Sequence, residues 1–170
     1  MQIRKSIIGF AILFAAALPA AAQSAHADIM NASGQKIGEA KLKQTKEGVS
    51  ISVNVSQIPP GTHGIHIHAA GQCTAPDFKT AGAHFNPDGK QHGAKNPNGM
   101  HNGDLPNITA DVEGKAKATF VDSHVTLGDG PNSLFPTGGT SIVIHAQPDD
   151  EMTDPSGNSG GRFACGVIQK

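Results

Sequence analysis

Alternating apolar and polar residues dominate the first half of the chain. From residue 49 to residue 56 every second residue is apolar, and the residues between them are serine or asparagine. This two-residue period predicts a β-strand with one buried face. A similar apolar pattern occupies residues 36–45, and the turn residues 46–48 separate the two segments. Residues 65–68 alternate in the same way, so the pattern predicts three strands before the middle of the chain.

Later segments carry the same signal. Residues 115–121, 141–146 and 163–168 are strand-like, and the chain lacks a convincing helical period. Short strands joined by turns that contain Gly or Pro favour an all-β sandwich or barrel. At 170 residues the chain has room for one domain, and neither an internal repeat nor an interdomain linker is visible.

Two long segments interrupt the strand pattern. The first long loop, residues 71–107, is rich in Gly, Pro, Asn and His, and the final loop, residues 147–161, is rich in Asp, Gly and Ser. Long irregular segments inside a compact domain are usually functional. We therefore expect the chemistry of this protein to involve these two loops.

The N-terminal sequence has the layout of a secretory signal peptide. Arg4 and Lys5 precede an apolar run over residues 7–18, and small residues then form cleavage sequences that end at Ala22 or Ala27. The alternative is a membrane anchor. An apolar run of about a dozen residues is too short to cross a bilayer, which needs about 20.

Cleavage of residues 1–27 would leave one domain over residues 28–170 and a periplasmic or secreted protein. The full chain has 13 Lys and Arg against 14 Asp and Glu, and loss of the signal peptide changes this balance to 11 against 14. A mildly acidic chain without a basic face argues against a nucleic-acid partner. No Cys lies near the cleavage sequences, so we expect no lipid or membrane anchor.

The mature sequence contains two cysteines, Cys73 and Cys165. An exported protein meets an oxidising compartment, so a disulfide between them is the default expectation. Closing a chain loop of this length stabilises a fold by about 4–5 kcal/mol. The alternative is a pair of free thiols in a metal site, but neither Cys has a second Cys or a His at zinc-finger spacing.

Histidines are concentrated on strands and in the first long loop. His66 and His68 are two residues apart on a predicted strand, so they point to the same face. Imidazole suits copper and zinc, and a carboxylate can complete a tetrahedral zinc site. Seven ligands are one short of the eight that two four-coordinate metals need, so one ligand is shared or one position stays open. The candidate ligands are His66, His68, His84, His92, His101, Asp104 and His145.

Three other histidines have simpler interpretations. His63 lies three residues before His66 and would face the other way on a continuing strand, so we interpret it as structural. His124 is isolated and is interpreted as a surface residue. His26 falls within the predicted signal region.

Four ordered motifs carry a family resemblance. The sequence reads GTHGIHIH at residues 61–68, AGAHFNP at 81–87, MHNGDL at 100–105 and GNSGGRFACGVI at 157–168. Together they resemble copper/zinc superoxide dismutase, and the short spacing between His68 and Cys73 is similar to that of the bacterial periplasmic branch. The resemblance implies an eight-stranded Greek-key β-barrel with two long functional loops, and this enzyme is itself an example of the sandwich architecture.

The resemblance also implies a role for each candidate residue. Copper would be bound by His66, His68, His84 and His145, and zinc by His84, His92, His101 and Asp104. His84 would be shared as an imidazolate, which accounts for the missing eighth ligand. Asp149 matches the carboxylate that orients His66 and His92 through their free ring nitrogens. Cys73 and Cys165 match the family disulfide, and Arg162 matches the arginine beside the copper channel.

The implied activity is conversion of superoxide to dioxygen and hydrogen peroxide by Cu(II)/Cu(I) cycling. His84, supported by zinc, would carry a proton, and Arg162 would dock the superoxide anion. One copper and one zinc per subunit are the expected cofactors. The alternative is a non-enzymatic periplasmic copper- and zinc-binding member of the same fold. A monomer and a homodimer both stay open.

The final loop departs from the family pattern. No Lys lies between His145 and Arg162, where many relatives have one. We therefore expect positive guidance of the anion only from Arg162 and the copper, with slower and less salt-sensitive catalysis. The loop instead carries four acidic residues, Asp149, Asp150, Glu151 and Asp154.

Overall fold

A computed structural model describes residues 23–170. Residues 1–22, which form most of the predicted signal peptide, lie outside the described residues. The expected all-β fold class is confirmed, and residues 23–170 contain nine strands and a single 3-10 turn, η1 (Lys79–Ala81). The strands are β1 (Ser24–Asn31), β2 (Lys36–Gln44), β3 (Val49–Val55), β4 (Gly61–His63), β5 (Ile65–His68), β6 (Ile108–Ala110), β7 (Ala116–Asp122), β8 (Ser141–His145) and β9 (Arg162–Val167).

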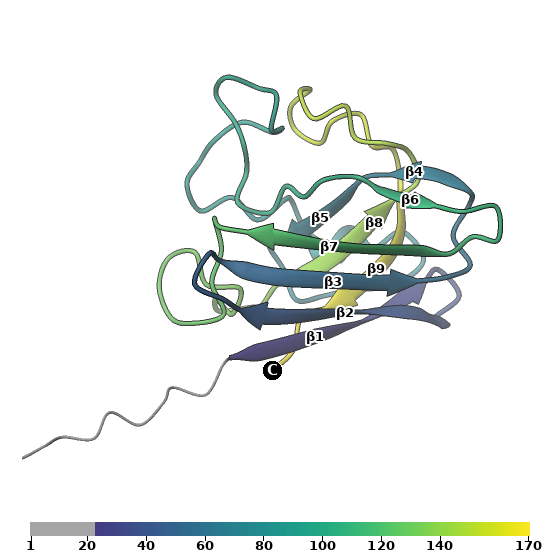
Figure 1. Ribbon diagram of the computed structural model, residues 1–170, viewed down its shortest axis with the longest axis horizontal. Coiled ribbons are helices and arrows are strands. Elements are labelled where there is room, and N and C mark those ends of the chain that lie inside the picture. Colours follow the sequence, from purple (N-terminus) through teal and green to yellow (C-terminus); the bar gives the residue numbers. More distant parts are fainter. Residues whose placement is uncertain (1–22) are drawn as a thin grey trace, which may run out of the picture.

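Seven of the strands form one curled antiparallel sheet in the order β5-β8-β9-β1-β2-β3-β7, and β4 and β6 form a separate pair (Figure 1). After β3 the chain crosses to the other end of the sheet to form β5, and after β7 it crosses back to form β8 beside β5. The resemblance implied eight strands. Only Gly64 separates β4 from β5, and these two segments counted as one strand would give the expected number.

Strand β1 begins four residues before the expected domain start at residue 28. Ala25 and Ala27 are buried, and His26 pairs with Lys41 of β2. The alternation of apolar residues that continues to Ile29 is therefore a strand pattern. The alanines of β1 also suit a signal-peptide cleavage sequence, and for that reason the sequence pattern did not predict this strand.

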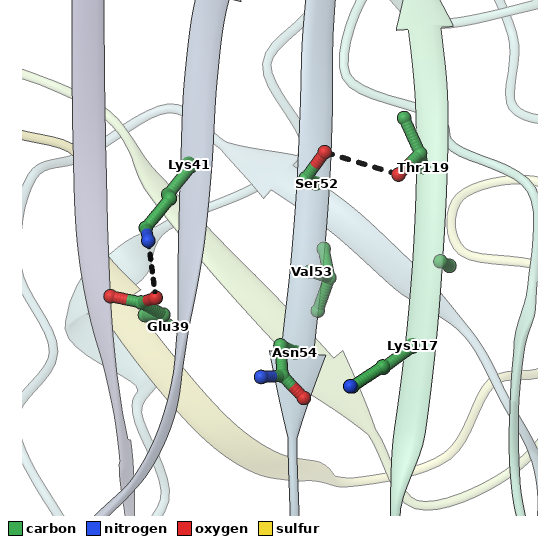
Figure 2. A pocket seen from close by; sticks show the side chains of 8 residues that line it. Glu39, Lys41, Ser52, Val53, Asn54, Lys117 and Thr119 are labelled. Carbon is green, nitrogen blue, oxygen red and sulfur yellow. Dashed lines mark hydrogen bonds and ion pairs between the residues drawn. The ribbon is translucent and has the colours of Figure 1, made fainter.

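The predicted two-residue period of β3 is confirmed. Its apolar residues face the core, and its serine and asparagine residues lie on the outer face of the sheet. Figure 2 shows this outer face as a shallow polar hollow across β2, β3 and β7. Ser52 Oγ and Thr119 Oγ1 are 3.1 Å apart, and Lys41 pairs with Glu39 at 2.9 Å. Solvated side chains of this kind account for the polar half of the pattern.

The first long loop and the final loop rise beside each other at the same end of the molecule, in teal and yellow in Figure 1. A backbone hydrogen bond joins them, in which Lys95 N–H donates to Glu151 O at 2.9 Å. The two segments that the sequence separates by the strands β6 to β8 therefore meet in space.

Candidate metal centre

Strands β5 and β8 bring three of the predicted ligands together. His66 and His68 are both buried on β5, and their spacing places them on one face of the strand. β8 pairs with β5, and His145 at its end donates its backbone N–H to Gly64 O at 2.8 Å. The ring centroids of His66 and His145 are 4.7 Å apart, and those of His68 and His145 are 5.7 Å apart.

His84 joins this group from the first long loop. It forms an isolated antiparallel bridge with His68, which places it against the end of β5. Its ring centroid lies 4.0 Å from that of His66 and 4.9 Å from that of His68. One donor atom from each of these four histidines lies within 4.8 Å of the others.

Each of the four histidines has one buried ring nitrogen without a hydrogen-bond partner among the described residues. These atoms are Nδ1 of His66 and Nε2 of His68, His84 and His145. Buried polar atoms in folded proteins nearly always have a partner, so four unpartnered lone pairs in one place require an explanation. A set of imidazole nitrogens suits copper, and these residues therefore fit a copper ion.

The opposite ring nitrogens hold the histidines in orientation. His66 Nε2–H donates to Asp149 Oδ2 at 2.7 Å, and His68 Nδ1–H donates to Gly82 O at 2.9 Å. These bonds fix the tautomer and direct the free nitrogen inward. Burial lowers the pKa of His68 to about 2 and that of His145 to about 3. Both rings are therefore neutral at pH 7, as a metal ligand must be.

A second group of ligands surrounds Asp104. Its Oδ1 lies 3.0 Å from Nδ1 of His84, 3.0 Å from Nδ1 of His92 and 3.3 Å from Nδ1 of His101. The Nδ1 atoms of His84 and His101 are 3.3 Å apart. Tetrahedral zinc with ligand distances of about 2.0–2.1 Å has donors about 3.3 Å from one another. The spacing of these atoms therefore fits a zinc ion.

The pKa values of the residues in this second group are shifted in different directions. Burial by itself would raise the pKa of Asp104, but hydrogen bonds from the three imidazoles hold that pKa well below its usual range. Burial would also lower the pKa of His92, yet its bonds to Asp104 and Asp149 raise the pKa to about 9. Burial lowers the pKa of His84 to about 4. Without metal, His92 is therefore protonated at pH 7 and His84 is neutral.

Asp149 connects the two groups. Its Oδ2 accepts from His66 Nε2 at 2.7 Å, and its Oδ1 accepts from His92 Nε2 at 3.0 Å. The side chain of Asn107 binds the backbone N–H and C=O of Asp149, at 2.8 and 2.9 Å. His66, His84, His92 and Asp104 also lie within 4.8 Å of one another, so the two groups overlap.

The expected disulfide is confirmed. Cys73 and Cys165 are bonded, with Cα atoms 5.6 Å apart and a sequence separation of 92. The bond ties the first long loop to β9, and Phe78 and Val143 pack around it. The disulfide therefore fixes the segment that precedes His84.

That fixed segment holds Arg162. Nη1 of Arg162 donates to Phe78 O at 2.6 Å, and Nη2 donates to Gly82 O at 2.5 Å. Arg162 lines an opening of about 440 Å³ whose floor includes three of the four histidines of the first group, His68, His84 and His145. A guanidinium held in this way is available to an anion that approaches these histidines.

Lys79 also lines this opening, a residue that the sequence reasoning did not single out. It lies on η1, five residues before His84, and its Nζ is 3.0 Å from Asp77 Oδ2. Its position within the same motif-bearing loop as His84 is the signal that could have indicated it. From the final loop the opening receives only Pro155, Ser156 and Gly160. The four acidic residues of the final loop are therefore not among the residues that line the opening.

The other three histidines stay outside both groups. His63 is buried with its ring nitrogens 2.8 Å from His145 O and 2.7 Å from Pro59 O, so it links two backbone segments. His124 lies 3.4 Å from a carboxylate oxygen of Asp122. His26, expected in the signal region, is an exposed residue of β1.

A curled antiparallel sheet with two adjoining groups of side chains that could each hold a metal ion is the arrangement expected of a two-metal β-sheet protein. The sequence model of the family described as copper/zinc superoxide dismutase (SODC) matches residues 36–168. Superoxide dismutase [Cu-Zn] 1 of Aquifex aeolicus is 51% identical over 146 residues, which cover 85% of this chain and 86% of the relative. The chain therefore belongs to the copper/zinc superoxide dismutase family.

Solved structures agree with this assignment. The crystal structure of a superoxide dismutase-like protein from Bacillus subtilis matches with a TM-score of 0.81 at 37% identity, over 84% of this chain and 96% of that one. The Cu/Zn superoxide dismutase from Brucella abortus matches with a TM-score of 0.69 at 28% identity, over 86% and 100% of the two chains. Among residues 23–170, no helix is long and apolar enough to span a membrane.

Proposed function

We propose that the chain is an enzyme that converts two superoxide anions and two protons into dioxygen and hydrogen peroxide. The observation that carries this proposal is the position of His84 between the two ligand groups. Its Nε2 is one of the four unpartnered nitrogens, and its Nδ1 is one of the atoms around Asp104. One imidazole can therefore serve both metals, as a seven-ligand site for two four-coordinate ions requires.

The residues divide between the metals by donor type. The nitrogen-only group, His66, His68, His84 and His145, would hold copper, and the group around the carboxylate, His84, His92, His101 and Asp104, would hold zinc. Bound copper supplies one-electron chemistry between Cu(II) and Cu(I), while zinc is not redox-active. Asp149 holds one histidine of each group, so a change at either metal is transmitted to the other.

The chain's own residues bring the anion and the proton together. Lys79 and Arg162 are cations at the opening above His84, and their charge draws a small anion inward. The guanidinium is held by two backbone carbonyls and keeps other N–H groups to receive the anion. His84 lines the same opening, and its Nε2 has no hydrogen-bond partner among the described residues, so this nitrogen can hold a proton and pass it to the reduced dioxygen. The second proton comes from solvent.

Metal analysis and superoxide turnover by the purified mature protein test this proposal. We expect one copper, one zinc and rapid turnover, and we expect His84→Ala to lose most of the activity. A fully loaded but inactive protein would support the alternative of a non-enzymatic metal-binding protein. A His84→Ala variant with turnover near that of the unaltered protein would contradict the proton-carrying role. Sedimentation of the same samples distinguishes a monomer from a homodimer.

The protein is proposed to be exported with cleavage after Ala22 rather than after Ala27. Cleavage after Ala27 would remove the first half of β1, where Ala25 and Ala27 are buried against the core. Cleavage after Ala22 leaves this strand whole. The mass of the mature protein from the periplasm or culture medium distinguishes the two sites, and an uncleaved chain would contradict export by this route.

A further inference from the structure

The acidic final loop turns one carboxylate toward the zinc ligands. Oδ1 of Asp154 accepts the backbone N–H of His92 at 2.6 Å, across 62 residues of sequence. The same oxygen lies 3.8 Å from Nε2 of His101. Asp154 is therefore next to two of the three histidines whose Nδ1 atoms surround Asp104.

We propose that Asp154 is a positioning residue for the zinc site, an inference that rests on the zinc ligands proposed above. The ring of His92 is held at Nε2 by Asp149, and its backbone is held by Asp154, so both ends of the residue are fixed. A displaced backbone would move Nδ1 away from the other donors. The hydrogen bond from the His92 backbone to Asp154 therefore orients this ligand from outside the zinc site, as partners of metal-bound histidines commonly do.

The contact with His101 is electrostatic. A separation of 3.8 Å is too long for a hydrogen bond, but it leaves a carboxylate on the side of the ring opposite to the donor atom Nδ1. Negative charge in that position makes an imidazole a stronger ligand. The side chain of Asp154 is 49% exposed, so water screens part of this effect. The hydrogen bond to His92 is therefore the stronger of the two contributions.

The two loops do not depend on this side chain for their association. Lys95 N–H donates to Glu151 O at 2.9 Å, and Asn96 Nδ2 donates to Met152 O at 3.2 Å. Both acceptors are backbone carbonyls, which a substitution of Asp154 leaves in place. Variants at this position should therefore fold with the loops still paired.

Three variants of the full mature protein separate the possible roles. Asp154→Ala removes both contacts, Asp154→Asn keeps an oxygen acceptor for His92 but removes the charge beside His101, and Asp129→Asn changes an exposed acid elsewhere. Zinc affinity is measured by competition with a chelator. Cobalt(II) bound in place of zinc gives a visible spectrum that reports the arrangement of the ligands.

We expect Asp154→Ala to bind zinc about 10–100-fold more weakly and to shift the cobalt spectrum. Asp154→Asn should lose less affinity and keep a spectrum like that of the unaltered protein, and Asp129→Asn should change neither. Unchanged affinity and spectrum in Asp154→Ala would overturn the inference. Weaker zinc binding with an unchanged spectrum would also overturn it, because the residue would then only stabilise the fold. Failure of the unaltered protein to bind zinc would instead reject the proposed function.

Discussion

Zinc binding by the metal-free protein should depend steeply on pH, because zinc has to displace a proton from His92. Nδ1 of this ring lies 3.0 Å from Asp104 Oδ1, and Nε2 lies 3.0 Å from Asp149 Oδ1. A ring between two carboxylates donates from both nitrogens and is therefore charged. Zinc would replace the proton on Nδ1 and leave the bond from Nε2 to Asp149 in place.

The size of the effect follows from the raised pKa of His92, about 9. Below that pH, each bound zinc releases one proton from His92, so the apparent zinc affinity should rise about tenfold per pH unit and level off above about pH 9. The same proton stabilises the metal-free fold. Because the folded pKa exceeds the ordinary value of 6.5, this contribution of about 3 kcal/mol is complete below pH 6.5 and disappears as the pH rises through 9.

Isothermal titration of zinc into the metal-free, disulfide-bonded protein tests this reasoning. Buffers with different heats of ionisation give the number of protons released, and urea unfolding at pH 6.5 and 9 gives the change in stability. His26→Gln, on the exposed face of β1, is a control that should leave both results unchanged. A zinc affinity that is flat between pH 6.5 and 8.5, with no proton released, would refute the charged state of His92.

Three further predictions concern the charges near the opening, the disulfide and Asp149. Lys79→Gln should lower and Asp77→Asn should raise the rate of reaction with superoxide by about two- to tenfold at low salt. The first removes a positive charge from the opening, and the second removes the negative partner of Lys79, which lies in a neighbouring hollow lined by Lys79 and Arg162. Pulse radiolysis should show both effects shrinking with added salt, and effects that persist would contradict steering. Replacement of both Cys73 and Cys165 by Ser should reduce the free energy of unfolding by about 4–5 kcal/mol in urea, given the 92-residue separation; a loss below about 1 kcal/mol would show that the loop-closure argument does not apply. Asp149→Asn should weaken copper and zinc binding, each by about 10–100-fold in chelator competition, and a loss confined to one metal would contradict its bridging position.

Local chemistry was enough to predict much of this fold. The period of two over residues 49–56 describes a strand between water and a core, and β3 has that burial pattern. The same reasoning failed at β1, because alanines that fill a small buried site also satisfy a cleavage sequence. The disulfide could be predicted because the sequence contains only two cysteines.

The sequence alone determined which donors are available and that seven of them cannot supply two separate four-coordinate sites. Tertiary structure decided which atoms converge, because Nδ1 and Nε2 of one ring are distinguished only by their neighbours. It also brought Lys79 to the opening and aimed Asp154 at the zinc ligands. Such contacts join segments far apart in the chain, and their distances depend on how whole loops pack against the sheet. Spacing along the sequence carries no measure of that packing.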